Sequence, residues 1–228
     1  MSPKETIFSK ETVLAAGISI VREKGWDHLT ARNVAGRLRS SVAPVYSTFG
    51  SMEALEREIL DDARRKLQAS TTVAYTDGAF LNIGVGIAVF AREEGNLFSA
   101  LFHTRHSHPD IVDGIFASIL ERMKADPMLR LLPDFSLERL LHYLGTYTLG
   151  LAASVVYGRG GDTATEYFIE RLKNAGNMMI FGEISGIADC ESPEKEREWT
   201  RILREKNIVL QPPDGPACGK GEEKKETS

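Results

Sequence analysis

The sequence predicts an all-α protein in which a unit of three short N-terminal helices precedes a larger helical bundle. Apolar residues recur at spacings of three and four through most of the 228 residues, which places them on one face of a helix. Sustained alternation of apolar and polar residues, the pattern of a strand, is nearly absent from the sequence. No apolar run reaches the roughly 18 residues that a membrane span needs. The composition, 42% hydrophobic and 26% charged, is typical of a soluble globular protein.

The first predicted helix begins after Ser9 and ends at Gly25. Its apolar positions Leu14, Ile18 and Val21 lie four and three residues apart, so they share one face. The hydroxyl of Ser9 can accept a hydrogen bond from one of the first backbone N–H groups, which have no partner inside the helix. Gly25 is the residue type that commonly follows the last helical residue.

A second, shorter helix is predicted in the segment TARNVAGRL, with Thr30 as its N-cap. Val34, Ala35 and Leu38 share the face that we expect to be buried. The basic and amide side chains of this helix, Arg32, Asn33 and Arg37, are left facing solvent. This short helix is the expected partner of the third helix, which follows after about three residues of turn.

The segment SSVAPVYSTFGSMEAL contains the third short helix. We expect Ser41 to be its N-cap. Pro44 falls in the first turn, where a missing N–H costs little because that group has no acceptor within the helix. Val45 and Phe49 lie four residues apart and are expected to face the core. Ser51 is then expected to cap the long helix that follows.

The rest of the chain is predicted to form a helical bundle and a tail. A long helix is expected over residues 52–74, and a disordered tail from Gln211, where proline, glycine and charge dominate and little can be buried. The helices expected between them cover residues 79–94, 96–102, 109–126, 136–158, 163–184 and 196–206. We therefore divide the chain into a head (residues 1–51), a body (52–188), and a short helix with a tail (189–228).

Three short helices followed by a long one match the order of a helix-turn-helix unit, whose last short helix lies in the major groove of DNA. Residues 13–59 also resemble, without a gap, the DNA-binding domain of the TetR family of transcriptional repressors. The resemblance is carried by Val13, Leu14, Ala16, Gly25, Thr30, Val34, Ala35, Ser41, Tyr46, Phe49, Ser51, Glu53 and Leu55. It implies a helix-turn-helix DNA-binding head on a helical effector-binding and dimerisation body.

The head departs from the family pattern in and around the third helix. The family commonly has glycine where Arg39 and Ala43 stand, an aliphatic residue at Ser40, and often histidine at Thr48. It usually has a lysine that meets a phosphate at the position of Met52, so that contact is not expected here. We interpret these differences as those of a variant within the family.

The third helix carries no charge, and base edges can be read without charge: hydroxyls bond several bases, and small apolar groups contact thymine methyls. The predicted base contacts are Val42, Ala43, Ser47 and Thr48, with Ser41 at the start of the same helix. The predicted phosphate contacts are Lys10, Thr30, Arg32, Arg39, Ser51 and Tyr46, which resembles a phosphate-binding tyrosine of the family. Seven basic and four acidic side chains give residues 1–51 a net charge of +3 within a chain of net charge −4, which favours a phosphate-facing head.

The resemblance also implies a homodimer whose body holds a mostly apolar cavity for a small-molecule effector, and it implies no cofactor. The cavity residues that we predict are Phe98, Phe102, His103, Phe116, Tyr143 and Tyr147, although packing in the core explains the same six residues. The predicted dimer interface consists of the last two long helices, over residues 136–158 and 163–184. A ligand in the cavity is expected to change the spacing of the two heads and to release a palindromic operator.

The segment HTRHSHPD contains His103, His106, His108 and Asp110, which are side chains that can bind Zn²⁺. A polar loop before a proline explains the same residues, and we predict no metal site. The glycine-rich segments lack the spacing of phosphate loops, and no catalytic motif is present. The sequence therefore predicts a binding protein and not an enzyme.

Two cysteines, Cys190 and Cys218, have no metal spacing, and the N-terminal segment MSPKETIFSKET is polar. We expect reduced thiols and a cytoplasmic protein that does not enter a membrane. Two other functions stay open from the sequence alone. One is a helical small-molecule carrier or enzyme that keeps the head without binding DNA, and the other is an adaptor that uses the head for protein contacts.

Overall fold

The computed structural model describes residues 8–104, 108–159, 161–188 and 201, and within them every regular element is a helix. In chain order these are α1 (Lys10–Lys24), η1 (Trp26–His28), α2 (Ala31–Leu38), α3 (Ala43–Phe49), α4 (Met52–Thr71), α5 (Ala79–Glu93), α6 (Gly95–Phe102), α7 (Pro109–Ala125), η2 (Leu129–Leu131), α8 (Asp134–Val156) and α9 (Thr165–Ala188). The predicted all-α class is confirmed. No helix in the described ranges is both long and apolar enough to cross a membrane.

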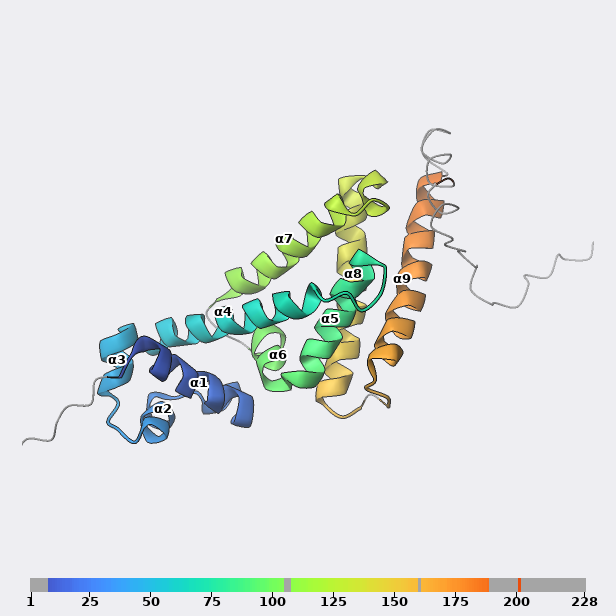
Figure 1. Ribbon diagram of the computed structural model, residues 1–228. Helices are drawn as coiled ribbons and strands as arrows, with labels where there is room; N and C mark the ends of the chain where they lie inside the picture. The colour runs from blue at the N-terminus through green and yellow to red at the C-terminus, as the bar shows by residue number, and fades with distance from the viewer. Residues whose placement is uncertain (1–7, 105–107, 160, 189–200, 202–228) are drawn as a thin grey trace, which may run out of the picture.

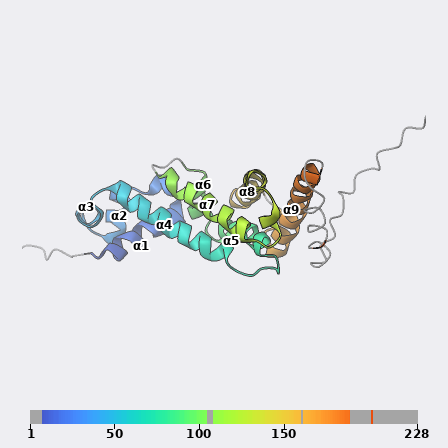
Figure 2. The ribbon, with the colours of Figure 1, turned by 90° about the horizontal axis from the view of Figure 1, so that it is seen from above.

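The molecule is elongated, with α1, α2 and α3 at one end and α8 and α9 at the other (Figure 1). Helix α4 runs from the head into the body, and α7 lies beside it in both views (Figures 1 and 2). Of the predicted helix over residues 196–206, only Arg201 is described, and it is helical. The predicted tail from Gln211 lies outside the described residues.

Hydroxyl caps set where three of the helices begin, as predicted. The side-chain oxygens of Ser9, Thr30 and Ser51 each accept a hydrogen bond from the backbone N–H three residues ahead, at 3.3, 3.2 and 3.1 Å. Helix α1 ends at Gly25, whose φ of 89° is a conformation that glycine adopts without steric cost.

Helix α3 begins later than predicted. Its N-cap is Val42 and not Ser41, and the backbone of Val42 is already in the right-handed helical region, with φ −75° and ψ −11°. Val42 makes no side-chain cap, and the hydroxyl of Ser41, one residue before this N-cap, accepts from the N–H of Ala43 at 3.3 Å. Pro44 lies in the first turn, as predicted.

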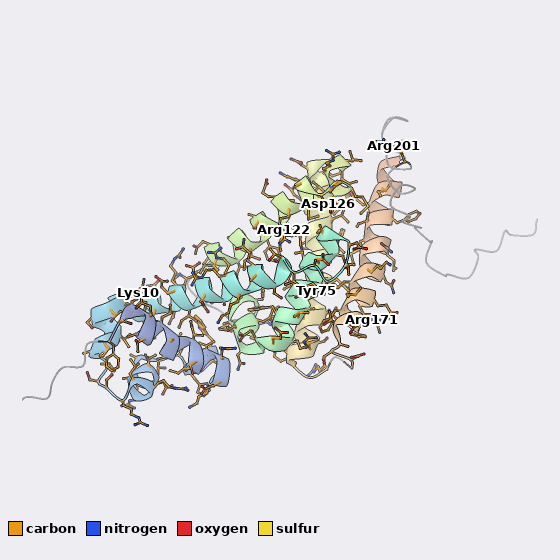
Figure 3. All side chains as sticks on the ribbon, viewed as in Figure 1. Lys10, Tyr75, Arg122, Asp126, Arg171 and Arg201 are labelled. Atoms are coloured by element: carbon orange, nitrogen blue, oxygen red, sulfur yellow. The ribbon has the colours of Figure 1, made fainter. Side chains whose placement is uncertain are left out.

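Helix α4 ends at Thr71, before the predicted end at residue 74. The hydroxyl of Thr72 donates to the carbonyl of Ala69 at 2.8 Å. The guanidinium of Arg122, which Figure 3 labels on α7, donates to the carbonyl of Thr71 at 2.7 Å and to its Oγ1 at 2.9 Å. A cation at a helix C-terminus is also favourable to the helix dipole. Because Arg122 is 51 residues away from Thr71 in the sequence, the local sequence pattern could not predict where α4 ends.

One main cluster of buried side chains runs through both head and body. Leu55 and Ile59 of α4 are fully buried in it, together with Val13 of α1 and Val45 of α3. A second cluster forms where Val85 of α5 meets α8 and α9. Because the main cluster crosses the predicted boundary between residues 51 and 52, the head is packed directly onto the body.

Helices α4 and α5 approach most closely at Gly86. A Cβ atom at this position would lie 2.5 Å from the carbonyl oxygen of Ser70 and 2.6 Å from the Cα of Thr71. The hydroxyl of Ser70 also donates to the carbonyl of Gly86 at 2.9 Å. Both obstructing atoms belong to the backbone, so a side chain at Gly86 would have to push the two helices apart.

We therefore expect Gly86→Ala to lower the free energy of unfolding by about 2 kcal/mol, the usual cost of overpacking. Gly114→Ala on α7 is the matched control, since nothing lies within 4 Å of a Cβ there. The control should be neutral or stabilising by about 0.5–1 kcal/mol, because alanine favours a helix more than glycine does. Urea denaturation of both variants measures the difference, and equal stabilities would contradict the close approach.

Candidate nucleic-acid interface

Helix α3 lies at the end of the molecule away from α8 and α9, and one side of it faces solvent (Figure 1). Val42 and Tyr46 are 42% and 49% exposed, which is unusual for large apolar or aromatic side chains. Of the other predicted DNA contacts in this segment, Ser41, Ala43 and Ser47 are exposed. Thr48 is half buried. The structure thus leaves Val42, Ala43, Tyr46 and Ser47 exposed on α3 and at its start.

The opposite side of α3 is anchored in the core. Val45 is fully buried, and Phe49 packs against the same cluster. The ammonium of Lys10 lies 5.5 Å from the centre of the Phe49 ring and 2.5 Å from a carboxylate oxygen of Glu58 on α4. Lys10 is therefore held by α4, although its side chain stays 50% exposed toward the solvent. As a phosphate contact it remains a prediction.

The predicted phosphate contacts flank α3. The hydroxyls of Thr30 and Ser51 accept backbone N–H groups, which leaves each hydroxyl proton available to a phosphate oxygen. Arg32 and Arg39 are exposed, and neither forms an ion pair within the described part of the chain. Two hydroxyl donors and two cations therefore lie on the elements that precede and follow α3 in the chain.

Arg39 occupies the turn between α2 and α3 in a left-handed conformation, with φ 53° and ψ 43°. Among the described residues it is the one non-glycine residue with positive φ. This conformation costs an L-residue about 1–2 kcal/mol, which a glycine avoids. Its backbone N–H still closes α2 by donating to the carbonyl of Gly36 at 3.2 Å. Arg39 thus occupies the turn before α3 although its left-handed backbone conformation is unfavourable.

Arg37 is a cation that the head uses internally. It donates to both carboxylate oxygens of Glu23, at 2.8 and 2.5 Å, and to the hydroxyl of Ser19 at 2.8 Å. The hydrogen bonds from Arg37, with a smaller effect from Ser19, lower the pKa of Glu23 to about 2. Since Glu23 and Ser19 belong to α1, this contact fixes α2 on α1.

The head is also held on helix α6. The guanidinium of Arg22 on α1 donates twice to the carboxylate of Glu94, at 2.7 and 2.6 Å. The amide nitrogen of Asn96 donates to the backbone carbonyl of Arg22 at 2.8 Å. Because Glu94 and Asn96 stand at the start of α6, a displacement of α6 would act directly on α1. We call these contacts the Arg22 junction.

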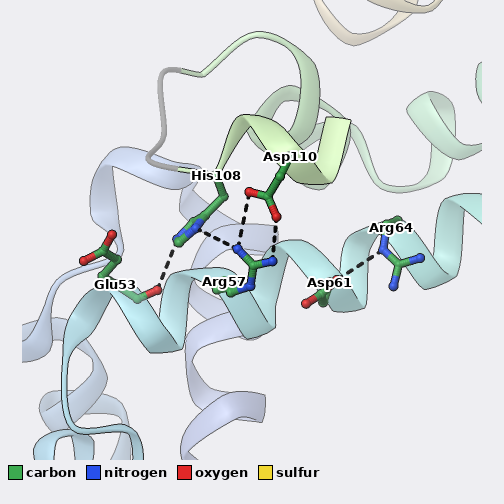
Figure 4. Close-up of polar contacts among 6 residues, drawn as sticks. All are labelled: Glu53, Arg57, Asp61, Arg64, His108 and Asp110. Carbon is green, nitrogen blue, oxygen red and sulfur yellow. Dashed lines mark hydrogen bonds and ion pairs between the residues drawn. The ribbon is translucent and has the colours of Figure 1, made fainter. Parts of the chain in front are cut away.

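A second polar junction joins the start of α4 to α7 (Figure 4). Arg57 donates to the two carboxylate oxygens of Asp110, at 2.6 and 3.3 Å, and this lowers the pKa of Asp110. His108 is 5% exposed; its Nδ1 lies 3.4 Å from Arg57 and its Nε2 3.2 Å from the carbonyl of Glu53. A neutral ring that accepts at Nδ1 and donates at Nε2 satisfies both contacts.

This junction accounts for two of the residues considered as zinc ligands. His108 and Asp110 both face Arg57, whereas His103 packs its ring 5.3 Å from that of Phe98. His106 lies outside the described residues. Within the ranges that the structure describes, no three histidine, cysteine or acidic side chains are grouped to hold a metal ion.

Four of the six predicted cavity residues form an aromatic cluster between α6 and α7. The ring of Phe98 lies 5.1 Å from Phe102 and 5.3 Å from His103, and Phe102 lies 6.5 Å from Phe116. Tyr157, which is not among the six predicted residues, adds to this cluster, because its ring lies 5.9 Å from that of His103. Its position just after α8 gave no periodic signal for this contact.

The other two predicted cavity residues lie elsewhere. Tyr143 is 51% exposed and contacts His142, so it points away from the aromatic cluster. Tyr147 packs against the second core cluster, which contains Phe168 of α9. Both tyrosines lie on helix α8. Their positions around the helix axis direct their side chains away from the aromatic cluster.

Exposed apolar side chains also gather on the last two helices. Tyr143 of α8 and Met178 and Phe181 of α9 are 51%, 57% and 37% exposed. Between these helices Arg139 forms an ion pair with the nearly buried carboxylate of Glu183, whose pKa is lowered by the hydrogen bonds from Arg139. The two helices are therefore fixed to each other while their outer apolar side chains remain uncovered.

Two solved structures share this fold. A TetR-like transcriptional regulator from Rhodococcus sp. RHA1 aligns with a TM-score of 0.58 at 14% identity, over 76% of this chain and 96% of that chain. A TetR variant from Acinetobacter baumannii AYE, in complex with minocycline, aligns with a TM-score of 0.54 at 15% identity, over 77% and 98%. No family model and no curated protein sequence matches the chain. The chain therefore has a TetR-like fold.

The contact between Glu23 and Arg37 makes a prediction about pH. Because the pKa of Glu23 is lowered from 4.5 to about 2 on folding, its stabilising effect is present above pH 4.5 and is lost as the pH falls through about 2. In Arg37→Ala the carboxyl should titrate near its ordinary value, as followed by NMR. The control Arg32→Ala should leave the titration of Glu23 unchanged. A wild-type midpoint near 4.5 would contradict the contact.

Proposed function

We propose that this protein is a transcriptional regulator, a repressor that binds a palindromic DNA operator as a homodimer and is released by a small-molecule effector. The observation that carries the proposal is the exposed, uncharged outer face of α3, anchored from behind by the fully buried Val45. Arg32 on α2 and Arg39 in the turn after it both precede α3 in the chain. A helix placed in this way can enter a groove while the rest of the head contacts the backbone of the DNA.

The dimensions of α3 suit the major groove. A helix with its side chains is about 10–12 Å wide, and the groove is about 12 Å wide. The seven residues of α3 span about 10 Å at 1.5 Å each, which is about three base pairs. Val42, Ala43, Ser47 and Thr48 would face base edges over this length. Tyr46 would direct its hydroxyl to a phosphate.

The start of α2 and the start of α4 suit phosphate oxygens. Thr30 and Ser51 place hydroxyl donors there, at the positive ends of the two helix dipoles. Arg32, Arg39 and Lys10 add cations near them. So few cations give a modest dependence of affinity on salt, and specific binding then requires two copies of the head.

The exposed apolar side chains of α8 and α9 support the proposal that the protein is a homodimer. A symmetric dimer through these helices would cover Tyr143, Met178 and Phe181, which are uncovered in the single chain. It would also set the distance between the two heads. Half-sites that lie one helical turn apart, about 34–36 Å, require such a fixed distance, and this accounts for a palindromic operator.

The aromatic cluster on α6 supports the proposal that a small-molecule effector binds in the body. Phe98, Phe102 and His103 present apolar and aromatic groups, which are typical linings of small-molecule sites. A protein of the same fold is in complex with minocycline. The Arg22 junction ties α6 to α1, so a ligand that binds better to one position of α6 would favour one position of the head.

Tyr46→Ala tests the DNA-binding helix. Loss of a hydrogen bond to a charged phosphate costs about 1.5–3 kcal/mol, so affinity should fall about 10- to 100-fold. Tyr46 is half exposed, and the variant should stay folded and dimeric. Fluorescence anisotropy with duplexes that the wild-type protein retains from its source genome measures the change. Val73→Ala, a body residue of similar exposure at 47%, is the control. Unchanged affinity in Tyr46→Ala would rule out this helix.

Met178→Glu tests the dimer. Burying a carboxylate against an apolar surface should raise the dimer dissociation constant at least about tenfold, equivalent to 1.4 kcal/mol. Sedimentation velocity over a concentration series measures this shift, and operator affinity should fall with it. Val73→Glu, in the turn after α4, should leave the dimer intact. An unchanged association state in Met178→Glu would place the dimer interface elsewhere.

A further inference from the structure

We infer that the outer face of α3 recognises thymine C5-methyl groups, with Val42 and Ala43 as the specificity-determining residues. The inference rests on the proposed function and specifies what the DNA-binding site reads. It predicts operator half-sites that place thymines opposite the N-terminal end of α3. It also predicts that hydrogen bonds to bases contribute little to the discrimination between sequences.

The segment from Ser41 to Ser51 lacks the side chains that pair with bases through two hydrogen bonds. Its sequence, SVAPVYSTFGS, contains no arginine, lysine, asparagine, glutamine, aspartate or glutamate. Arginine and lysine commonly read guanine, asparagine and glutamine read adenine, and the acidic residues accept from cytosine. What remains on the outer face of α3 is hydroxyl groups and small apolar groups.

The structure further reduces what the hydroxyls can read. Ser47 donates its proton to the carbonyl of Pro44 at 3.3 Å, and while that bond is made it can only accept from a base. Ser41 already accepts from the N–H of Ala43 at 3.3 Å, so it is left mainly as a donor. Thr48 is half buried. A single donor meets acceptors on guanine, adenine and thymine alike, and therefore discriminates weakly between them.

The apolar groups stand where a recognition helix meets bases. Val42 and Ala43 form the N-terminal end of α3, and residues at this end of a recognition helix contact base edges. Val42 is 42% exposed, although valine is among the residues most often buried. The thymine methyl is the apolar group on the major-groove edges of the four bases, and it alone gains from contact with these side chains.

Arg39 is the strongest competing reader. It lies in the turn just before α3, and its guanidinium is exposed. A guanidinium can bind guanine through two hydrogen bonds or contact a phosphate without reading sequence. Its place in the turn, ahead of the helix that would occupy the groove, favours the phosphate. The two roles make opposite predictions about the selected sequence.

The test begins with duplexes that the full-length protein selects from a randomised pool. Each thymine of a selected half-site is then replaced by deoxyuridine, which lacks the methyl and keeps every hydrogen-bonding group. We expect one or two positions per half-site at which affinity falls about fourfold, which corresponds to about 0.8 kcal/mol for one buried methyl-sized group. Deoxyuridine outside the half-sites is the control and should have no effect.

Val42→Ala completes the test as a double-mutant cycle. Val42 makes no side-chain cap and is exposed, so the variant should fold as the wild type does. The variant should bind the thymine duplex less tightly, and deoxyuridine at the affected position should then cost it little more. Arg39→Ala should weaken all duplexes by a similar factor.

The outcomes separate the inference from the proposed function. Selected duplexes that tolerate deoxyuridine at every position would overturn the inference and leave DNA binding established. A guanine preference that disappears in Arg39→Ala would overturn it in favour of Arg39 as the reader. A folded dimer that selects no duplex would overturn the proposed function, and the inference with it.

Discussion

The buried apolar face of α4 is the constraint on which the rest of the structure depends. Leu55 and Ile59 lie in the same core cluster as the helices of the head, and Leu67 continues that cluster into the body. At Gly17 of α1 a Cβ atom would lie 2.7 Å from the side chain of Ile59, so the two helices pack closely. The head is therefore oriented by close packing on a helix that continues into the body, and α3 is left with one free face.

Polar contacts between helices help to orient the head on the body, but they add little to the stability of the fold. Exposed ion pairs stabilise a protein by about 0–1 kcal/mol, so the Arg22 junction and the contact between Arg57 and Asp110 contribute little to folding. Each one, however, links the end of the molecule that carries α3 to a helix that borders the aromatic cluster. Displacement of α6 or α7 would therefore be transmitted to the head at two separate places. This is the arrangement that an effector-controlled binding protein requires.

Local signals in the sequence predicted the helices of the head well, because Ser9, Thr30 and Ser51 cap their helices through contacts within three residues. Ser41 was misjudged because α3 begins one residue later than predicted, at Ala43, and the type of residue 41 does not report that shift. The end of α4 depends on Arg122, and the pKa of Glu23 on Arg37, which are contacts between separate helices. The same limit applies to Tyr143 and Tyr147: helical period places them on α8 but does not say which neighbour each one meets.

The most direct test of the account is the sequencing of duplexes retained by the purified full-length protein from a random pool at near-physiological salt. The account predicts a two-fold symmetric motif whose half-sites are separated by about one turn of DNA. The protein should be refolded free of ligand beforehand, so that a bound effector cannot hold the heads apart. A folded, ligand-free dimer that enriches no motif would contradict the account and would leave the head as a surface for another kind of partner.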